Sequence, residues 1–285
     1  MAERLSGAPV AKALDKETKE RADRLAEHGV QPTLAVLRVG ENDADISYEK
    51  NIIKKASKNG IAVKQVILPE DVENEAFFEV LDSLNHDDAV HGILMFRPLP
   101  AHLDGERART GIAAEKDVDG CSDLSLAGVF IGKELGFAPC TAQAVIELLD
   151  FYNIDLKGKD VCLAGRSLVV GKPLSSLCTN RHATVDLCHS RTTDLPGHAR
   201  RSDILITAIG RAGFFTADYV DPEKGQIVID VGMNTDEEGK LCGDAVYDEL
   251  EPLVKAITPV PGGVGSVTTA VLMRHVVEAC ERTTR

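Results

Sequence analysis

The chain has little aromatic character and no long apolar segment. Tryptophan is absent, and the aromatic residues together make up 4% of the 285 residues. No stretch approaches the roughly 20 consecutive apolar residues that a membrane-spanning helix needs. The N terminus also lacks the charged-then-apolar pattern of a secretory leader. We therefore expect a cytoplasmic protein that makes no contact with a membrane.

The seven cysteines follow no metal-binding or disulfide pattern. They are scattered without a Cys-x-x-Cys pair, and an odd number cannot be fully bridged within one chain. We expect reduced thiols, as in most cytoplasmic proteins. We also expect no metal site, because structural metal sites use closely spaced ligands.

Positive charge is in short supply. The chain has 32 lysines and arginines against 45 aspartates and glutamates, which is a net charge of −13. A charge of this sign disfavours binding to nucleic acid and to anionic membranes. An anionic ligand must therefore be held by local positive charge rather than by the field of the whole molecule.

Helical and strand-like periodicities alternate along the chain, which is typical of parallel sheets covered by helices. The predicted helices cover 11–28, 45–59, 75–85, 141–152 and 267–280, and the predicted strands cover 33–39, 61–68, 92–96, 161–164, 183–188, 204–209 and 226–231. We expect an α/β protein of two lobes with a ligand cleft between them. We expect residues 1–138 to form the first domain and residues 139–265 a second, Rossmann-type domain with a parallel sheet. The C-terminal helix, 266–285, is expected to pack back onto the first domain.

A candidate dinucleotide-binding motif lies near the start of the second lobe. The apolar run 161–164 leads into Gly165-Arg166-Ser167 and then into a helix that opens near Gly171. Gly165 permits a tight turn, and the N–H groups of the loop meet the positive end of the helix, where a pyrophosphate can be held. The motif reads G-x-S-x-x-x-G rather than G-x-G-x-x-G, so by itself it also fits an ordinary strand-to-helix turn.

The tip of the next strand indicates which dinucleotide binds. His189-Ser190-Arg191 follows strand 183–188, at the position where NAD-specific sites carry an acidic residue for the ribose 2′-hydroxyl. Ser190 and Arg191, with Arg166 from the first loop, instead offer a hydroxyl donor and positive charge that suit a 2′-phosphate. We predict NADP rather than NAD, although both arginines also fit solvated surface positions.

Further motifs occur in order along almost the whole chain. They are Tyr48 on a predicted helix, Gly92-Ile93-Leu94 with Pro98-Leu99-Pro100, Lys116-Asp117-Val118-Asp119-Gly120, Pro139-Cys140-Thr141, the loop described above, Ile229-Asp230-Val231-Gly232, and the run TPVPGGVG over 258–265. In this order the set resembles the methylenetetrahydrofolate dehydrogenase/methenyltetrahydrofolate cyclohydrolase family.

The resemblance implies a homodimeric enzyme that oxidises 5,10-methylenetetrahydrofolate to the 5,10-methenyl form with NADP. In the family the product is usually hydrolysed to 10-formyltetrahydrofolate at the same site. By this likeness domain 1–138 binds the folate and domain 139–265 binds NADP. Asp119 would grip the pterin edge and Tyr48 would line the folate pocket, and these two residues form the predicted catalytic set.

The same likeness defines two larger sets of residues. The predicted substrate-binding residues are Tyr48, Ile52, Met95, Phe96, Arg97, Asp119, Pro261, Gly262, Gly263, Val264 and Gly265. The predicted cofactor-binding residues are Gly165, Arg166, Ser167, Gly171, His189, Ser190, Arg191, Gly210, Gly232, Met233 and Thr258.

The chain departs from the family at two positions of the implied folate pocket. Bifunctional members carry Tyr-x-x-x-Lys on the second helix, and the lysine is credited with the cyclohydrolase step, whereas the fourth residue after Tyr48 is Ile52. Lys50 lies roughly 200° round the helix from Tyr48 and cannot take its place. Phe96 replaces the glutamine that supports the lysine in the family. Because neither side chain can activate water, we predict a cyclohydrolase activity that is weak or absent.

Other functions fit parts of the sequence. The chain could be an ordinary bifunctional enzyme in which a displaced lysine reaches the pocket. A non-catalytic NADP-binding sensor is a second alternative, although it would not need to retain Tyr48, Asp119 and the 258–265 loop. A dehydrogenase of the amino-acid or shikimate type would need a catalytic Lys/Asp pair, for which Asp117 and Asp119 are the acidic candidates.

Overall fold

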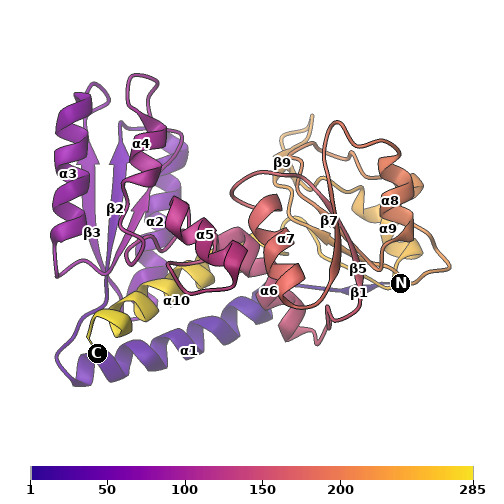
Figure 1. Ribbon diagram of the computed structural model, residues 1–285, viewed down its shortest axis with the longest axis horizontal. Helices are drawn as coiled ribbons and strands as arrows, with labels where there is room; N and C mark the ends of the chain where they lie inside the picture. The colour runs from indigo at the N-terminus through magenta and orange to yellow at the C-terminus, as the bar shows by residue number, and fades with distance from the viewer. Residues whose placement is uncertain (1, 285) are drawn as a thin grey trace. The chain divides into compact units, whose positions relative to one another are not determined.

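The computed structural model describes residues 2–284, which form two compact units (Figure 1). The C-terminal unit contains the residues up to Lys12 and Cys140–Thr268, and the N-terminal unit contains Ala13–Pro139 and the residues from Thr269 onward. The chain passes between the units three times, within the two long helices α1 (Gly7–Glu27) and α10 (Gly265–Thr283) and between Pro139 and Cys140. The predicted α/β class is confirmed.

The N-terminal unit is built on three parallel strands in the order β3-β2-β4. The central strand is buried along its length except at its two ends, which fits the apolar run that predicted it. The elements are β2 (Thr33–Val39), α2 (Asp43–Lys58), β3 (Ala62–Leu68), α3 (Asn74–His86), β4 (Gly92–Met95), α4 (Gly105–Thr110) and α5 (Asp123–Ile131). The two short helices α4 and α5 were not predicted.

Helix α2 carries two of the predicted site residues, and its start is fixed by a side-chain cap. The Asn42 side-chain oxygen accepts hydrogen bonds from the N–H groups of Ala44, at 2.9 Å, and Asp45, at 3.3 Å. Acidic residues occupy the first turn and lysines the last turn, as the helix dipole favours. Because the cap fixes the residue at which α2 begins, it helps to fix which residues of α2 face the sheet.

A buried ion pair joins α2 to the sheet. Arg38 lies in β2, and its Nε donates to Glu49 Oε2 on α2 at 2.8 Å. Gln65 of β3 donates to the other Glu49 oxygen at 2.9 Å. The side chains of Arg38 and Glu49 are 6% and 3% exposed, so neither charge can be satisfied by water if its partner is removed. The sequence signal was an arginine inside an otherwise apolar strand.

The C-terminal unit is built on six parallel strands in the order β1-β11-β8-β7-β5-β6. Its strands are β1 (Glu3–Arg4), β5 (Asp160–Ala164), β6 (Thr184–Cys188), β7 (Ile204–Thr207), β8 (Ile227–Asp230) and β11 (Ala256–Ile257). Its helices are α6 (Cys140–Phe151), α7 (Gly171–Asn180), α8 (Leu195–Arg201), α9 (Tyr247–Leu250) and the 3₁₀ turns η1 (Ala217–Tyr219) and η2 (Glu251–Leu253). A small antiparallel hairpin of β9 (Asn234–Thr235) and β10 (Leu241–Cys242) completes it.

The first residues of the chain belong to this sheet, which differs from the predicted boundary of 1–138. Glu3 and Leu5 donate their N–H groups to the carbonyls of Lys255, at 2.8 Å, and Ile257, at 2.9 Å. Strand β1 thereby provides hydrogen-bond donors for carbonyl groups of β11 that would otherwise be unpaired. A two-residue strand has no periodicity, so the sequence pattern could not reveal it.

No helix within residues 2–284 is both long and apolar enough to cross a membrane.

We expect Glu49→Ala to lower the free energy of unfolding by about 3–5 kcal/mol, because it leaves the Arg38 guanidinium buried and unpaired. The matched double variant Arg38→Met/Glu49→Leu removes both charges and should cost much less. Urea unfolding monitored by circular dichroism measures both. Equal losses in the two variants would contradict this account of the ion pair.

Candidate active site

Two glycines shape the loop between β5 and α7. Gly165 follows β5 with a φ of +128°, and a Cβ there would lie 2.2 Å from the Ala208 carbonyl oxygen. Gly171 is the first residue of α7, and a Cβ there would lie 2.0 Å from the Gly165 carbonyl oxygen. The strand and the helix therefore approach so closely that only glycine fits at both positions.

Ser167, which stands where the standard motif has a second glycine, fixes the same loop. Its hydroxyl accepts a hydrogen bond from the Val170 N–H at 3.1 Å, and its carbonyl accepts one from the Lys172 N–H at 3.0 Å. The serine thus orders the backbone that leads into the N terminus of α7. The altered motif still forms a loop at a helix N terminus.

A cavity of about 340 Å³ lies at the carboxyl ends of β5, β6 and β7. Five of the predicted cofactor residues line it together, namely Gly165, Arg166, Ser167, His189 and Ser190. None of the lining residues in the described chain is acidic, and Arg166 and Arg211 bring positive charge. The lining fits a phosphorylated nucleotide, since it combines backbone N–H groups, a hydroxyl and two guanidinium groups.

The sequence did not point to Arg211 and Phe214, which line this cavity, and it pointed to Arg191, which does not. The Arg211 guanidinium lies 4.6 Å from the centre of the Phe214 ring, and both residues line the cavity. The sequence could have indicated Arg211, because it is a basic residue directly after Gly210 in the loop that follows β7. Arg191 is not among the lining residues, and its N–H donates to His189 Nδ1 at 3.1 Å.

A second cavity, of about 180 Å³, lies between the segment that follows β8 and the loop 259–266. It is lined by two predicted cofactor residues, Gly232 and Met233, and by all five predicted substrate residues of the loop, Pro261–Gly265. The loop is held against the start of α1, because Gly7 donates to the Gly262 carbonyl at 2.8 Å. A Cβ on Gly7 would lie 2.0 Å from the Gly263 carbonyl oxygen, so this approach also needs glycine.

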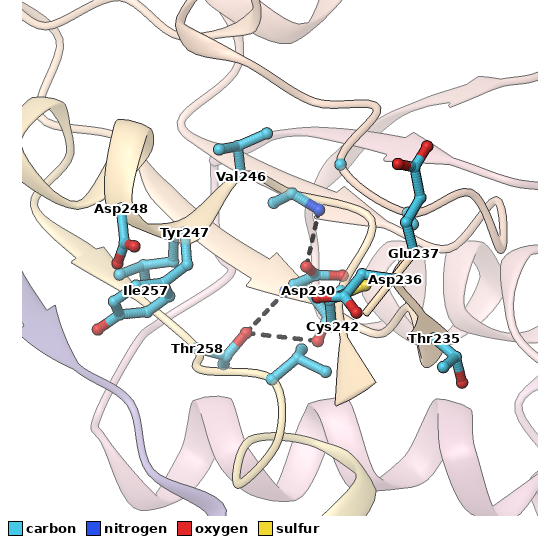
Figure 2. A pocket seen from close by; sticks show the side chains of 15 residues that line it. Asp230, Thr235, Asp236, Glu237, Cys242, Val246, Tyr247, Asp248, Ile257 and Thr258 are labelled. Carbon is cyan, nitrogen blue, oxygen red and sulfur yellow. Dashed lines mark hydrogen bonds between the residues drawn. The ribbon is translucent and has the colours of Figure 1, made fainter. Parts of the chain in front are cut away.

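Thr258 lies elsewhere, in the lining of a larger cavity of about 560 Å³ (Figure 2). Its hydroxyl is buried and accepts a hydrogen bond from the Asp230 N–H at 2.7 Å. Thr258 therefore joins the ends of β8 and β11. Gly210, unlike Thr258, lines none of these three cavities. Its N–H donates to Asp244 at 3.2 Å.

In the N-terminal unit, Tyr48 of α2 lies next to Phe96, the residue that follows β4. The Tyr48 and Phe96 rings lie with their centres 5.5 Å apart. Ile52 is fully buried, and Met95 and Phe96 are nearly so, whereas Tyr48 is 41% exposed. The positions at which the resemblance implies a lysine and a glutamine are therefore occupied by two buried apolar side chains, Ile52 and Phe96.

The lysines of α2 that lie near Ile52 in the sequence are exposed or paired with another residue. Lys50 and Lys54 are exposed. The Lys55 ammonium lies 3.0 Å from an Asp15 carboxylate oxygen and is engaged there. The displaced-lysine alternative therefore finds no candidate on this helix.

Asp119 has a cationic partner that the sequence did not indicate. Arg97 Nη2 lies 3.3 Å from Asp119 Oδ2, and each side chain is 30% exposed. Arg97 follows Phe96 directly, so the positive charge stands one residue beyond the position of the family's glutamine. The pair brings together two of the predicted substrate-binding residues.

Asp117, an acidic candidate for a Lys/Asp pair, and its neighbour Lys116 bond to backbone groups instead. The Asp117 carboxylate is buried and accepts hydrogen bonds from the N–H groups of Cys121 and Ser122 at 3.0 and 2.7 Å. The Lys116 ammonium donates to the carbonyls of Leu84 and Asp87. Neither forms the dyad that an amino-acid or shikimate dehydrogenase would need. Within residues 2–284 no cluster of three or more histidine, cysteine, aspartate or glutamate residues could hold a metal ion.

This fold, with a glycine-shaped cavity at the carboxyl ends of a parallel sheet, defines a dinucleotide-binding protein of the Rossmann type. Residues 139–284 match the family model of the tetrahydrofolate dehydrogenase/cyclohydrolase NAD(P)-binding domain, and residues 5–119 match the catalytic domain of the same family. The chain belongs to the tetrahydrofolate dehydrogenase/cyclohydrolase family, as the resemblance predicted.

Individual members are similar over their whole length. The bifunctional protein FolD of Carboxydothermus hydrogenoformans is 48% identical over 283 residues, which cover 99% of this chain and 98% of that protein. The crystal structure of the bifunctional FolD enzyme of Campylobacter jejuni has a TM-score of 0.96 at 37% identity and 99% coverage of both chains. The Trypanosoma brucei FolD structure, a complex with NADP cofactor and inhibitor, has a TM-score of 0.90 at 34% identity and covers 100% of this chain and 99% of its own.

Proposed function

We propose that the protein oxidises 5,10-methylenetetrahydrofolate to 5,10-methenyltetrahydrofolate with NADP, and that its cyclohydrolase activity is weak or absent. Family membership supports the dehydrogenase. The observation that carries the second part is that both positions hold buried apolar side chains, Ile52 and Phe96. We further expect a cytoplasmic homodimer, as the family resemblance implies.

The hydride transfer itself needs no acid or base from the protein. Hydride leaves a carbon that stands between two nitrogens, whose lone pairs stabilise the resulting cation. NADP, when bound, supplies the hydride acceptor. The protein has to orient the folate and exclude water. Tyr48, which is partly exposed, offers aromatic surface to a ring, and Asp119 can accept hydrogen bonds from the amino and N–H groups of a pterin.

Hydrolysis of the product makes a different demand, because a water molecule must be activated beside the methenyl carbon. Ile52 and Phe96 carry no proton donor or acceptor. The Arg97 guanidinium is permanently protonated and is held by Asp119 at 3.3 Å, so it is a poor base. The nearest described lysines of α2 are exposed or paired elsewhere.

An ordinary bifunctional enzyme is the second candidate, and the names of the relatives favour it. A non-catalytic sensor is disfavoured, since the chain retains Tyr48, Asp119 and the loop that lines the second cavity.

Cofactor preference follows from the cavity beside β5 and β6. Arg166, Arg211 and Ser190 line it without an acidic neighbour in the lining, which suits a ribose 2′-phosphate better than a 2′-hydroxyl. The charge is local, since the chain as a whole is acidic. Arg191 is less suited to this role than predicted, because it does not line the cavity.

We expect the purified protein to reduce NADP with methylenetetrahydrofolate but to accelerate the decay of added methenyltetrahydrofolate at less than about 1% of that rate, since general acid–base catalysis is worth about 10²- to 10⁴-fold. Absorbance at the methenyl maximum, with and without protein, measures the decay. Catalysed decay as fast as dehydrogenation would show that the bifunctional alternative is correct.

Restoring the family's side chains should restore hydrolysis. We expect Ile52→Lys/Phe96→Gln to raise the catalysed decay of methenyltetrahydrofolate at least about tenfold, because an amine and its amide partner return to the pocket. The apolar double variant Ile52→Leu/Phe96→Leu is the matched control and should show no gain. A folded Lys/Gln variant with no more hydrolysis than this control would argue against the role assigned to residues 52 and 96.

Arg166→Ala should lower kcat/KM for NADP by about 10- to 100-fold, the size expected for loss of a charge-assisted hydrogen bond. It should change kcat/KM for NAD less than about threefold. Arg181→Ala, which removes an arginine paired with Asp150 at the end of α7, is the control and should leave both values unchanged. Equal kcat/KM values of the unaltered protein for the two cofactors would sink the NADP preference.

A further inference from the structure

Asp244 is fully buried, yet none of the cavities described above is lined by it. Its carboxylate accepts hydrogen bonds from three consecutive backbone N–H groups, those of Ile209 at 2.6 Å, Gly210 at 3.2 Å and Arg211 at 2.8 Å. The Asn234 side-chain amide donates a fourth, at 2.9 Å. A carboxylate is the side chain that can accept all four.

A second buried carboxylate, Asp230, sets the position of the first. It accepts hydrogen bonds from the N–H groups of Gly232, Asp244 and Ala245 at 2.9, 3.1 and 2.9 Å, and from the Thr207 hydroxyl at 2.9 Å. Figure 2 shows Asp230 in the lining of the cavity of about 560 Å³, next to Thr258. Burial raises the pKa of Asp230 to about 6, so the group is mainly ionised at neutral pH, as four donors require.

The two carboxylates explain two glycines. A Cβ on Gly232 would lie 2.4 Å from Asp244 Cγ, and a Cβ on Gly243 would lie 1.9 Å from Asp230 Oδ2. Gly232 was expected in the cofactor site from its place after a strand. In the structure, a side chain at residue 232 would collide with Asp244. Glycine is therefore required at this position whether or not a cofactor contacts it.

The segments that Asp244 holds are walls of two different cavities. Ile209 and Arg211 line the cavity beside the β5–α7 loop, and Asn234 directly follows Gly232 and Met233, which line the cavity at the 259–266 loop. The four donors thus come from the segments after β7 and β8, which meet on one carboxylate.

We propose that Asp244 is a positioning residue for the dinucleotide, which fixes the backbone of 209–211 and, through Asn234, the segment after β8, so that both cavities are shaped at once. The inference rests on the proposed function, because it takes the two cavities as parts of one NADP site. Asp244 acts through these segments and touches no part of the cofactor itself.

Asp244→Asn tests the proposal, because one carboxylate oxygen becomes an NH₂ group that faces a donor and loses its hydrogen bonds. We expect Kd and KM for NADP to rise about 10- to 100-fold, with kcat within about threefold and KM for methylenetetrahydrofolate unchanged. Titration of cofactor binding by calorimetry and steady-state kinetics measure these values. A variant that is less stable but binds NADP as tightly as the unaltered protein would overturn the proposal.

A milder variant covers the case in which Asp244→Asn does not fold. Asn234→Leu keeps a side chain of similar size and removes one donor, and it should raise Kd for NADP about three- to tenfold. The control is Asp203→Asn, which makes the same chemical change at the amino ends of β5 and β7. There Asp203 accepts a hydrogen bond from the Asp160 N–H at 2.9 Å. It should leave Kd for NADP unchanged. An unchanged Kd in Asn234→Leu would also overturn the proposal.

Failure of the proposed function gives a different result. If the unaltered protein binds no NADP or does not oxidise methylenetetrahydrofolate, the function is wrong before any variant is compared. If it does both and the Asp244 and Asn234 variants bind NADP normally, only the role of Asp244 is wrong.

Discussion

Backbone N–H groups are buried at the carboxyl ends of the six-stranded sheet, and each needs a hydrogen-bond acceptor. This need determines how the loops around the proposed cofactor site are arranged. Where β7 and β8 end, the chain turns into loops whose N–H groups are shielded from water, and an unpaired buried N–H costs about 1–3 kcal/mol. Asp230 and Asp244 supply the acceptors and are themselves almost fully buried. The glycines at 232 and 243 follow from this arrangement, since side chains there would meet the two carboxylates.

Under the proposed function, two side chains of the N-terminal unit separate a dehydrogenase from a hydrolase on the same scaffold. The buried Arg38–Glu49 pair joins the capped helix α2 to the sheet, and Tyr48 of this helix contacts Phe96 after β4. Hydride transfer depends on this scaffold, because it needs orientation and dryness. Hydrolysis depends on a proton-transferring group, and an identity of 48% over the whole chain says little about single positions in the pocket.

Much of the fold could be predicted, because long apolar runs and helical periodicity survive in single segments. Strand 33–39 was predicted with the bounds of β2, and the helix that opens near Gly171 begins at that residue. The two-residue strands β1, β9, β10 and β11 could not be predicted, since their partners are distant in sequence or joined by an irregular turn. The predicted strands 204–209 and 226–231 end earlier in the structure, because their last residues turn into the loops that Asp244 and Asp230 hold.

The sequence by itself determined the α/β class, the family and the apolar substitutions at residues 52 and 96, since these depend on local order and on residue identity. Tertiary structure alone decided which predicted residues share a cavity. It placed Arg211 in the same cavity lining as Arg166 and left Arg191 outside that lining. It also paired Arg97 with Asp119. It also assigned Thr258 and Gly210 to the hydrogen bonds that hold the strand ends. The physical reason is that hydrogen bonds and charge pairs join residues through space, and sequence periodicity records only which face of an element is buried.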